Sequence, residues 1–285
     1  RTMSARTEQG GDGTPGDRLP SVHRLDSSDL RSLTDCYTRV FEQHHGMFKR
    51  TDFQMSSLLG EGETKLVAGA FRSSAGNAEE LAGYAAFHFV RGFDGLRGED
   101  NIYLNDILVD ELVYDSPEAL TGLLEFFGRQ ADQAQHLILR SQDRNLYHLF
   151  DDPGDRSQNV IPPAYHQSSK VGVGLMYRII DVGKALAAYR EVRGWPDDRP
   201  VEVTTYDELI PENNGTYRIG SSGNTGREPE RVSANIRELS SLLMGAVSID
   251  ALAVLGLVDA IPRYRHHFID VLFPGNPEPL CLSGF

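Results

Sequence analysis

The sequence has little cysteine, which excludes two kinds of small scaffold. Only Cys36 and Cys281 occur among 285 residues, far apart and without CxxC spacing. A disulfide framework needs several cysteines and a structural zinc site needs clustered ones, so neither is expected. Two isolated cysteines are typical of a reducing compartment, and we predict a cytoplasmic location.

A membrane-spanning run is also missing. The most apolar stretch, Leu239 to Val258, contains Asp250 together with the breakers Gly245 and Ser248. We therefore interpret it as two short buried helices rather than a membrane span. No signal peptide is visible, and the sequence opens on Arg1, which is not a translation start. We expect that a preceding part has been trimmed or excised.

Positive charge is scarce. The 28 Lys and Arg residues are outnumbered by 41 Asp and Glu residues, which gives a formal net charge of −13. Nucleic acid and anionic membrane surfaces need clustered basic residues, so neither is expected as a partner. A cationic small molecule would be attracted. The acidity has a simpler explanation too, because net charge by itself keeps a protein soluble.

Motifs for phosphate, metal and acyl chemistry are absent. Neither GxxxxGK[ST] nor GxGxxG occurs, the run Val171 to Gly174 has too few glycines, and there is no GxSxG elbow. The pairs His44–His45 and His266–His267 are adjacent, and on a helix such side chains point about 100° apart. We interpret them as surface or capping histidines, and no metal site is expected.

The strongest pattern that is present is a strand leading into a helix between Asn101 and Arg129. Residues Ile102 to Tyr114 are rich in Ile, Leu, Val and Tyr, which predicts a strand. The consecutive Ile107 to Val109 break the alternation, which indicates a bulge or burial on both faces. We interpret Asp110 and Glu111, like Asp151 and Asp152, as solvated or loop charges.

The turn after this strand decides whether a coenzyme could bind there. Asp115 or Ser116 can cap the following helix, and Pro117 suits its first turn. Such a turn can hold a phosphate, but this one has no glycine, and Asp115 and Glu118 would repel a pyrophosphate. We predict that it binds no coenzyme. The apolar face of the helix should pack on the sheet through Leu120, Leu123, Leu124 and Phe127.

Further elements around this unit predict an α/β domain over residues 21–169, preceded by a flexible tail, Arg1 to Pro20. Its helices are expected at Asp26–Gln43 and Arg50–Leu59, and its other strands at Lys65–Arg72, Ala82–Arg91 and His136–Arg140. The first two of these strands should form a hairpin.

The composition shifts near Lys170, and we predict a smaller second domain over residues 170–285. Strands are expected at Leu175–Asp181, Pro200–Tyr206, Thr216–Ile219 and Pro279–Phe285, and helices at Val182–Arg193, Ile236–Met244, Ser248–Val258 and near Ile261–Leu272. The sequence ends on an apolar segment, so a docked strand could fix the α-carboxylate of Phe285. A fixed carboxylate can act as a general base for a protonated amine, whereas a docked strand without catalytic role is the alternative.

The order of several segments resembles the Eis-like N-acetyltransferase family. These segments are Phe41–Met47 with Arg50, Gly83–Tyr84, Asp115–Leu120, Met176–Val182, Asn214–Tyr217, Leu239–Gly245 and Pro279–Phe285. The family joins an acetyl-CoA-binding GNAT domain, a second GNAT-like domain without a working coenzyme loop, and a domain resembling sterol carrier proteins. This chain resembles only the last two.

The resemblance implies a GNAT-like mixed α/β sheet with flanking helices, followed by a sterol-carrier-protein-2-like α+β domain. It implies acetyl transfer from acetyl-CoA to amines such as aminoglycosides, polyamines or lysine side chains, with no coenzyme held by this chain itself. The family's proposed base, its C-terminal carboxylate, falls on Phe285, and several members form homo-oligomers. No acceptor-binding residue can be assigned. The alternative is a non-catalytic binding or assembly module, motivated by the apolar stretch Leu239 to Val258.

Overall fold

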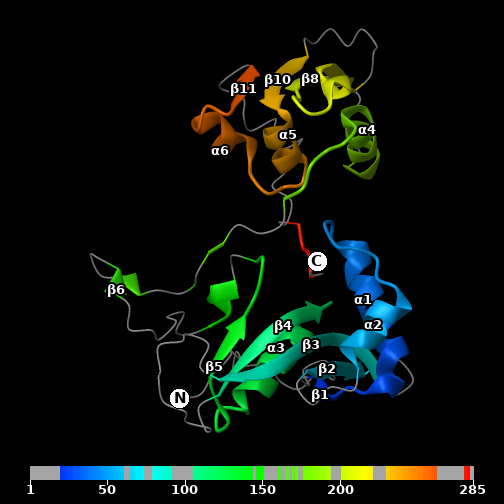
Figure 1. Cartoon of the computed structure of the whole chain (residues 1–285), viewed down its shortest axis with the longest axis vertical. Coiled ribbons are helices and arrows are strands. Elements are labelled where there is room, and N and C mark those ends of the chain that lie inside the picture. Colours follow the sequence, from blue (N-terminus) through cyan, green and yellow to red (C-terminus); the bar gives the residue numbers. More distant parts are fainter. Residues whose placement is uncertain are drawn as a thin grey trace, which may run out of the picture. The chain divides into compact units, whose positions relative to one another are not determined.

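The computed structural model describes two units of the chain. The described residues are 20–60, 65–73, 79–91, 105–143, 146–150, 160–161, 165–166, 169, 171–172, 176–193, 200–220, 229–261 and 279–282. The first unit comprises residues 1–172 with 282–285, and the second comprises residues 173–281 (Figure 1). Each unit has a sheet and a hydrophobic core of its own.

The first unit is built on a five-stranded sheet in the order β1-β2-β3-β4-β5. The strands are β1 (Ser21–Arg24), β2 (Leu66–Ser73), β3 (Glu79–Arg91), β4 (Asn105–Tyr114) and β5 (Ala134–Leu139). The first four are antiparallel neighbours, so the predicted hairpin of β2 and β3 is confirmed, whereas β4 and β5 are parallel. A parallel pair needs a crossover, which the helix α3 (Pro117–Gly128) provides.

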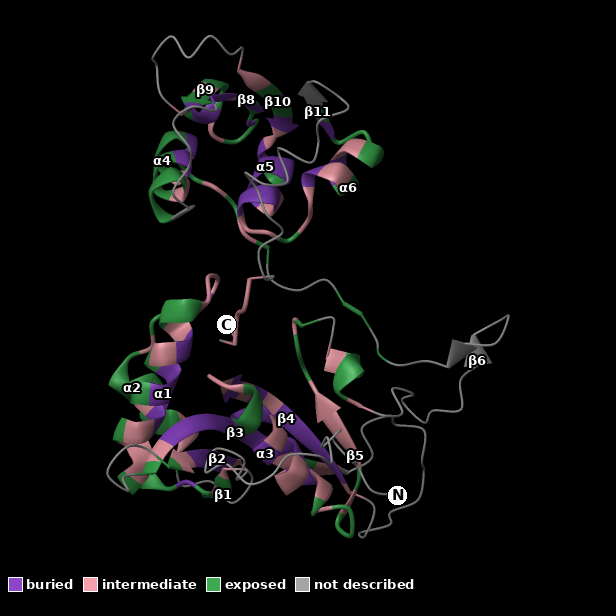
Figure 2. Ribbon diagram, turned by 180° about the vertical axis from the view of Figure 1, so that it is seen from behind, coloured by how far each residue is buried: buried purple, intermediate pink, exposed green. Residues whose placement is uncertain are grey.

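Helix α3 begins and packs as its sequence predicts. The Ser116 hydroxyl accepts a hydrogen bond from the Ala119 N–H at 3.3 Å, and Pro117 opens the helix. The predicted apolar residues of α3 are all buried. Its Phe127 ring meets Phe87 of β3 edge to face, with centroids 5.1 Å apart. Figure 2 shows β3 and β4 as the buried centre of this sheet.

The other helices of the first unit also follow the sequence pattern. Helix α1 (Leu30–Gln43) is preceded by a short 3₁₀ turn (Ser27–Asp29), and α2 (Asp52–Leu58) begins at a capping box formed by Thr51 and Gln54. Helix α1 contacts β3 and β4. Shorter elements are the 3₁₀ turn Leu146–Leu149 and the two-residue strands β6 (Val160–Ile161) and β7 (Tyr165–His166).

The second unit is a four-stranded sheet with helices, in the order β11-β10-β8-β9. Its strands are β8 (Val201–Tyr206), β9 (Gly215–Ile219), β10 (Glu230–Asn235) and β11 (Val258–Ile261), and its helices are α4 (Val182–Arg193), α5 (Ile236–Leu243) and α6 (Ile249–Val254). A 3₁₀ turn, Pro211–Asn213, lies in the connection from β8 to β9. The predicted mixed α/β architecture is confirmed, and the apolar stretch holds two short helices as expected.

Two predicted strands of the second unit are wrong within the described residues. Residues 176–181 are irregular, because side chains bind their backbone: Ser240 Oγ accepts from the Ile179 N–H, and Asn213 Nδ2 donates to the Ile180 carbonyl, both at 3.1 Å. Residues 279–282 are irregular as well, and 283–285 lie outside the described residues. So do the predicted tail up to residue 19 and residues 262–272 of the predicted last helix.

Gly83 marks a close approach of β3 to β4 and α3, which makes it a test of this packing. An added Cβ would lie 2.9 Å from the Val113 carbonyl oxygen and 3.2 Å from Ala119 Cβ. Gly83→Ala should therefore lower the free energy of unfolding by about 1–3 kcal/mol. Gly122→Ala is the control, because its Cβ comes no closer than 3.4 Å to Pro20 and alanine favours a helix by about 1 kcal/mol. Native-state hydrogen exchange of β3 and β4 measures both, and equal shifts would contradict the close approach.

Candidate functional site

A β-bulge in β4 turns Glu111 toward the face of the sheet opposite α3. The β3–β4 register shifts where Ala86 pairs with Glu111 and Phe87 pairs with Val109, so Asp110 is an extra residue. Val109 packs in the core beside α3. Since one extra residue reverses the alternation of side chains, Glu111 faces the other way. The predicted irregularity is thus confirmed, with a bulge and burial on both faces.

Glu111 is buried and fully paired, so its prediction as a solvated charge is wrong. Its two carboxylate oxygens each accept a 2.7 Å hydrogen bond from Arg50, and one of them also accepts from the Tyr84 hydroxyl. The side chains of Arg50 and Glu111 are 7% and 5% exposed. The Arg50 guanidinium carbon also lies 4.4 Å from the centroid of the Tyr37 ring. A bidentate pair of this kind is the strongest form of charge-assisted hydrogen bond.

The protonation states in this cluster are fixed by burial and charge. Burial raises the pKa of the Tyr84 hydroxyl well above its usual value, and the charge of Glu111 raises it further. Burial alone would lower the pKa of Arg50, but Glu111 outweighs it and the pKa is raised. Tyr84 therefore stays a neutral donor and Arg50 stays charged. Arg50 and Tyr84 therefore act as hydrogen-bond donors that hold Glu111 in place.

The same guanidinium reaches the far end of the sequence. Nη2 of Arg50 donates to the carbonyl oxygen of Leu282 at 3.2 Å. Phe285, the predicted general base, lies three positions further on and outside the described residues. The contact therefore holds the chain just before the predicted catalytic carboxylate.

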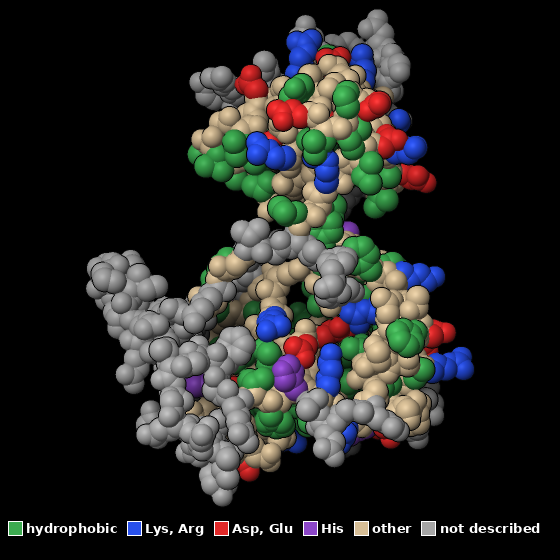
Figure 3. Space-filling view, viewed as in Figure 1, with side chains coloured by type: hydrophobic (Ala, Val, Ile, Leu, Met, Phe, Trp, Pro, Cys, Tyr) green, Lys and Arg blue, Asp and Glu red, His purple; other side chains and the backbone are tan. Residues whose placement is uncertain are grey.

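Further polar side chains lie on the same face of the sheet as Glu111. We call this set the polar strip: His88, Asp106, Asp110, Glu111 and His136. His88, Asp106 and Asp110 each stand next to a residue that packs beside α3, so the alternation of side chains places them on the opposite face. Their neighbours are Phe87, Ile107 and Val109. Nδ1 of His88 lies 2.8 Å from Asp110, and Nδ1 of His136 lies 2.8 Å from Asp106. Figure 3 shows acidic, basic and histidine side chains gathered across the middle of this unit.

The polar strip brings no metal site together. Within the part of the chain that the structure describes, no group of three or more His, Cys, Asp or Glu side chains could hold a metal ion. Nδ1 of His44 lies 2.9 Å from the Val40 carbonyl oxygen at the end of α1, as expected for a capping histidine. His266, His267, Asp151 and Asp152 lie outside the described residues. Burial raises the pKa of the Cys36 thiol to about 12, so it is no nucleophile.

The turn from β4 to α3 holds a buried carboxylate that is paired with two arginines. The Asp115 carboxylate is 5% exposed and binds Arg39 at 3.2 Å and Arg72 at 2.9 Å. The Asp115 N–H donates to the Ala82 carbonyl oxygen, and the Ala119 N–H donates to the Ser116 hydroxyl. Pro117 has no N–H. Most donors that could meet an anion are thus engaged or missing, and a carboxylate occupies the turn.

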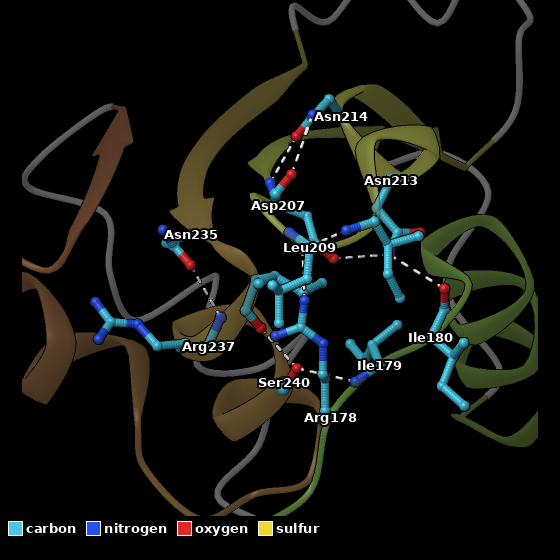
Figure 4. A network of polar contacts seen from close by, with 12 residues as sticks. Arg178, Ile179, Ile180, Asp207, Leu209, Asn213, Asn214, Asn235, Arg237 and Ser240 are labelled. Atoms are coloured by element: carbon cyan, nitrogen blue, oxygen red, sulfur yellow. Dashed lines mark hydrogen bonds and ion pairs between the residues drawn. The ribbon is translucent and has the colours of Figure 1, made fainter.

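A second polar network lies in the second unit around Asp207 (Figure 4). Its buried carboxylate accepts from Arg178, from Asn213 Nδ2 at 3.0 Å, and from the N–H groups of Leu209 and Ile210 at 2.9 and 3.1 Å. Burial alone would raise the pKa of Asp207, but the hydrogen bonds from Asn213 and the loop together with Arg178 lower it. The network fixes the loop between β8 and β9 to residues 176–181, so it has a structural role.

Sequence patterns missed the Arg50–Glu111 pair because the two residues lie 61 positions apart. A signal was nevertheless present. Glu111 stands between apolar residues of a strand predicted to be buried, and a buried charge needs a partner of opposite sign. No pattern, however, selects Arg50 among the 28 basic residues.

Family comparisons define the class of protein. Residues 46–179 match the family described as acetyltransferase (GNAT) domain, and residues 182–282 match the family described as sterol carrier protein domain. The chain thus has a GNAT-like fold followed by a domain that is similar to sterol carrier proteins. No curated protein matches the sequence significantly. No helix within the described ranges is long and apolar enough to cross a membrane.

Solved structures share this fold over both domains. Eis1 from Mycobacterium abscessus is 22% identical, with a TM-score of 0.62 over 95% of this chain and 65% of its own. A probable N-acyltransferase of unknown function from Enterococcus faecalis V583 is 17% identical, with a TM-score of 0.62 over 94% and 63%. A GCN5-related N-acetyltransferase from Kribbella flavida is 20% identical, with a TM-score of 0.58 over 95% and 61%. Such identities show the fold alone, and the chain spans less than two thirds of each protein.

The Asp207 network should make the second unit sensitive to acid. A carboxylate whose pKa is lowered by folding stabilises the folded state above its unfolded pKa, and this contribution is lost as pH falls through the folded pKa. Asp207→Asn should therefore be less stable than the wild type at pH 7, and the difference should shrink below about pH 4. Fluorescence of Trp195, the single tryptophan, follows unfolding of this unit. A difference that stays constant across this pH range would contradict the assigned role.

Proposed function

We propose that this chain is the C-terminal part of an Eis-like, acetyl-CoA-dependent N-acetyltransferase. In this proposal it supplies the scaffold, part of the acceptor pocket and a catalytic carboxylate, while a separate GNAT domain holds the coenzyme. The observation that carries the proposal is a GNAT fold whose β4–α3 turn is occupied by the buried Asp115. The order of a GNAT domain and a sterol carrier protein domain, and the shorter length of the chain, support it.

The α-carboxylate of Phe285 is the proposed general base. An α-carboxyl group has an ordinary pKa of about 3.3–3.7, so it is ionised at neutral pH and can accept a proton from an ammonium group. The contact between Arg50 and Leu282 supports this assignment, since it holds the chain three residues earlier. Taking a proton from the acceptor leaves a neutral amine, which is the form that can act as a nucleophile.

The acceptor we propose is a cationic amine of the aminoglycoside, polyamine or lysine type. The net charge of −13 favours the approach of such molecules. We also propose a homo-oligomer located in the cytoplasm, following the family resemblance and the lack of a disulfide at Cys36 and Cys281.

A second candidate is an apolar-ligand or assembly module. Its support is the match of residues 182–282 to the sterol carrier protein domain, together with exposed apolar side chains beside α6. These are Val254, Leu255 and Leu257, which are 88%, 68% and 47% exposed. Incubation with a lipid extract followed by mass spectrometry separates the candidates, because only a lipid-binding module would retain a lipid.

If a separate GNAT domain holds the coenzyme, this chain by itself should not bind acetyl-CoA. Titration calorimetry of the chain with acetyl-CoA should give no heat of binding at micromolar concentration, because Asp115 opposes an anion at the turn. Asp115→Asn separates the charge from the backbone: it should also give no heat, since Pro117 and the engaged N–H groups remain. Micromolar binding by the unaltered chain would refute the proposed absence of a coenzyme site.

The base predicts a strong dependence of turnover on the last residue. In the enzyme that also contains the coenzyme domain, a few residues added after Phe285 should lower kcat by about 10²–10⁴ by displacing the carboxylate. Phe285→Leu is the matched control, because it keeps an α-carboxylate at the same position and should retain most activity. Turnover on several amines measures both variants, and unchanged turnover in the extended enzyme would remove Phe285 from the mechanism.

A further inference from the structure

Arg50 is a buried cation whose donors all need partners within the protein. With 7% of its side chain exposed, it cannot rely on water. Glu111 takes one hydrogen bond from Nη1 and one from Nη2, each at 2.7 Å. Each of these nitrogens carries two hydrogens, so Nη2 has a second donor to place. The carbonyl oxygen of Leu282 accepts from it at 3.2 Å.

The orientation of Arg50 is fixed by contacts that do not involve Leu282. Directly after it, Thr51 and Gln54 form the reciprocal capping box that starts α2, which fixes the backbone at this point. The Tyr37 ring lies against the guanidinium, and its hydroxyl donates to the Phe48 carbonyl at 2.6 Å. The Arg50 donor is therefore already in place when the Leu282 carbonyl oxygen accepts its hydrogen bond.

The acceptor of this Arg50 hydrogen bond is a backbone carbonyl oxygen and not a side chain. Arg50 therefore recognises the path of the chain near Leu282. Hydrogen bonds to a charged donor are stronger than neutral ones, above all where water is excluded. Leu282 groups with the first unit and not with residues 173–281, which precede it in the sequence.

We propose that Arg50 is the docking residue for the end of the chain at Leu282 and thereby, in the function proposed above, a positioning residue for the Phe285 carboxylate. Phe285 follows Leu282 by three residues, and three residues span at most about 10 Å of chain. Glu111 and Tyr84 act on the end of the chain through Arg50. The catalytic consequence rests on the function proposed above, whereas the docking itself does not.

Hydrogen exchange of the C-terminal segment tests the docking in the whole chain. Lysine keeps a positive charge beside Glu111, but its single ammonium group cannot reproduce the planar fork that serves Glu111 and Leu282 together. In Arg50→Lys, the peptide covering Leu280 to Phe285 should exchange about tenfold faster, read by mass spectrometry.

Arg72→Lys is the matched control. Arg72 also binds a buried carboxylate of the same sheet, Asp115, at 2.9 Å. Its side chain is 39% exposed, so it loses a less buried ion pair of the same sheet, and exchange of the C-terminal segment should stay at the wild-type rate. Equal acceleration in both variants, or none in Arg50→Lys, would overturn the proposal.

A second variant keeps the test decisive if Arg50→Lys does not fold. Glu111→Gln leaves Arg50 in place but removes the charge that orients its fork, so the segment should again exchange faster than in the Arg72→Lys control. Unchanged exchange would overturn the docking just as directly.

The docking by Arg50 and the Phe285 base can be refuted independently of each other. Faster exchange in Arg50→Lys, with unchanged turnover after extension of Phe285, supports the docking and refutes the carboxylate base. Unchanged exchange, with turnover lost on extension, refutes the docking and supports the base.

Discussion

The buried ion pair between Arg50 and Glu111 is the interaction on which the first unit depends. An ion pair in this setting loses its hydration, and only near-ideal geometry with further hydrogen bonds offsets that loss. The bulge at Asp110, the hydroxyl of Tyr84 and the capped start of α2 together provide this geometry. Because removal of one partner would leave an isolated buried charge, the pair ties β3, β4 and the segment before α2 into one arrangement.

The strand-to-helix turn of this GNAT-like unit is held by its own ion pairs. Two arginines, Arg39 and Arg72, converge on the buried Asp115, so the positive charges near this turn serve an internal carboxylate. Glu80 joins the same cluster, which balances two cations with two anions. The turn has thus become part of the structure's own charge balance, while the sheet and α3 keep the packing that defines the fold.

Sequence patterns found the elements that depend on local periodicity. Helices α1 and α3, the β2–β3 hairpin and the two helices of the apolar stretch all follow from spacing and capping residues. Strands β1, β10 and β11 were missed. β1 has Val22 as its only apolar side chain and β10 has only Val232 and Ala234, whereas β11 falls where two helices were predicted to end and begin. The irregular residues 176–181 look like a strand in sequence, but Ser240 and Asn213 bind their backbone from distant positions. The pairing of Glu111 with Arg50 and Tyr84 was not predicted for the same reason, since it depends on tertiary contacts.

The contact between Arg50 and Leu282 joins residues 232 positions apart. A ribosome makes the GNAT domain first, and domains generally fold as units while synthesis continues. Arg50 and Glu111 can therefore pair long before Leu282 has been synthesised. The hydrogen bond from Arg50 to Leu282 can form only after the residues of the second unit have been translated. Closing so long a loop is slow compared with local folding. Completion of the GNAT domain's buried polar site is therefore a late event in biogenesis, which occurs only in chains whose synthesis has passed through the second domain.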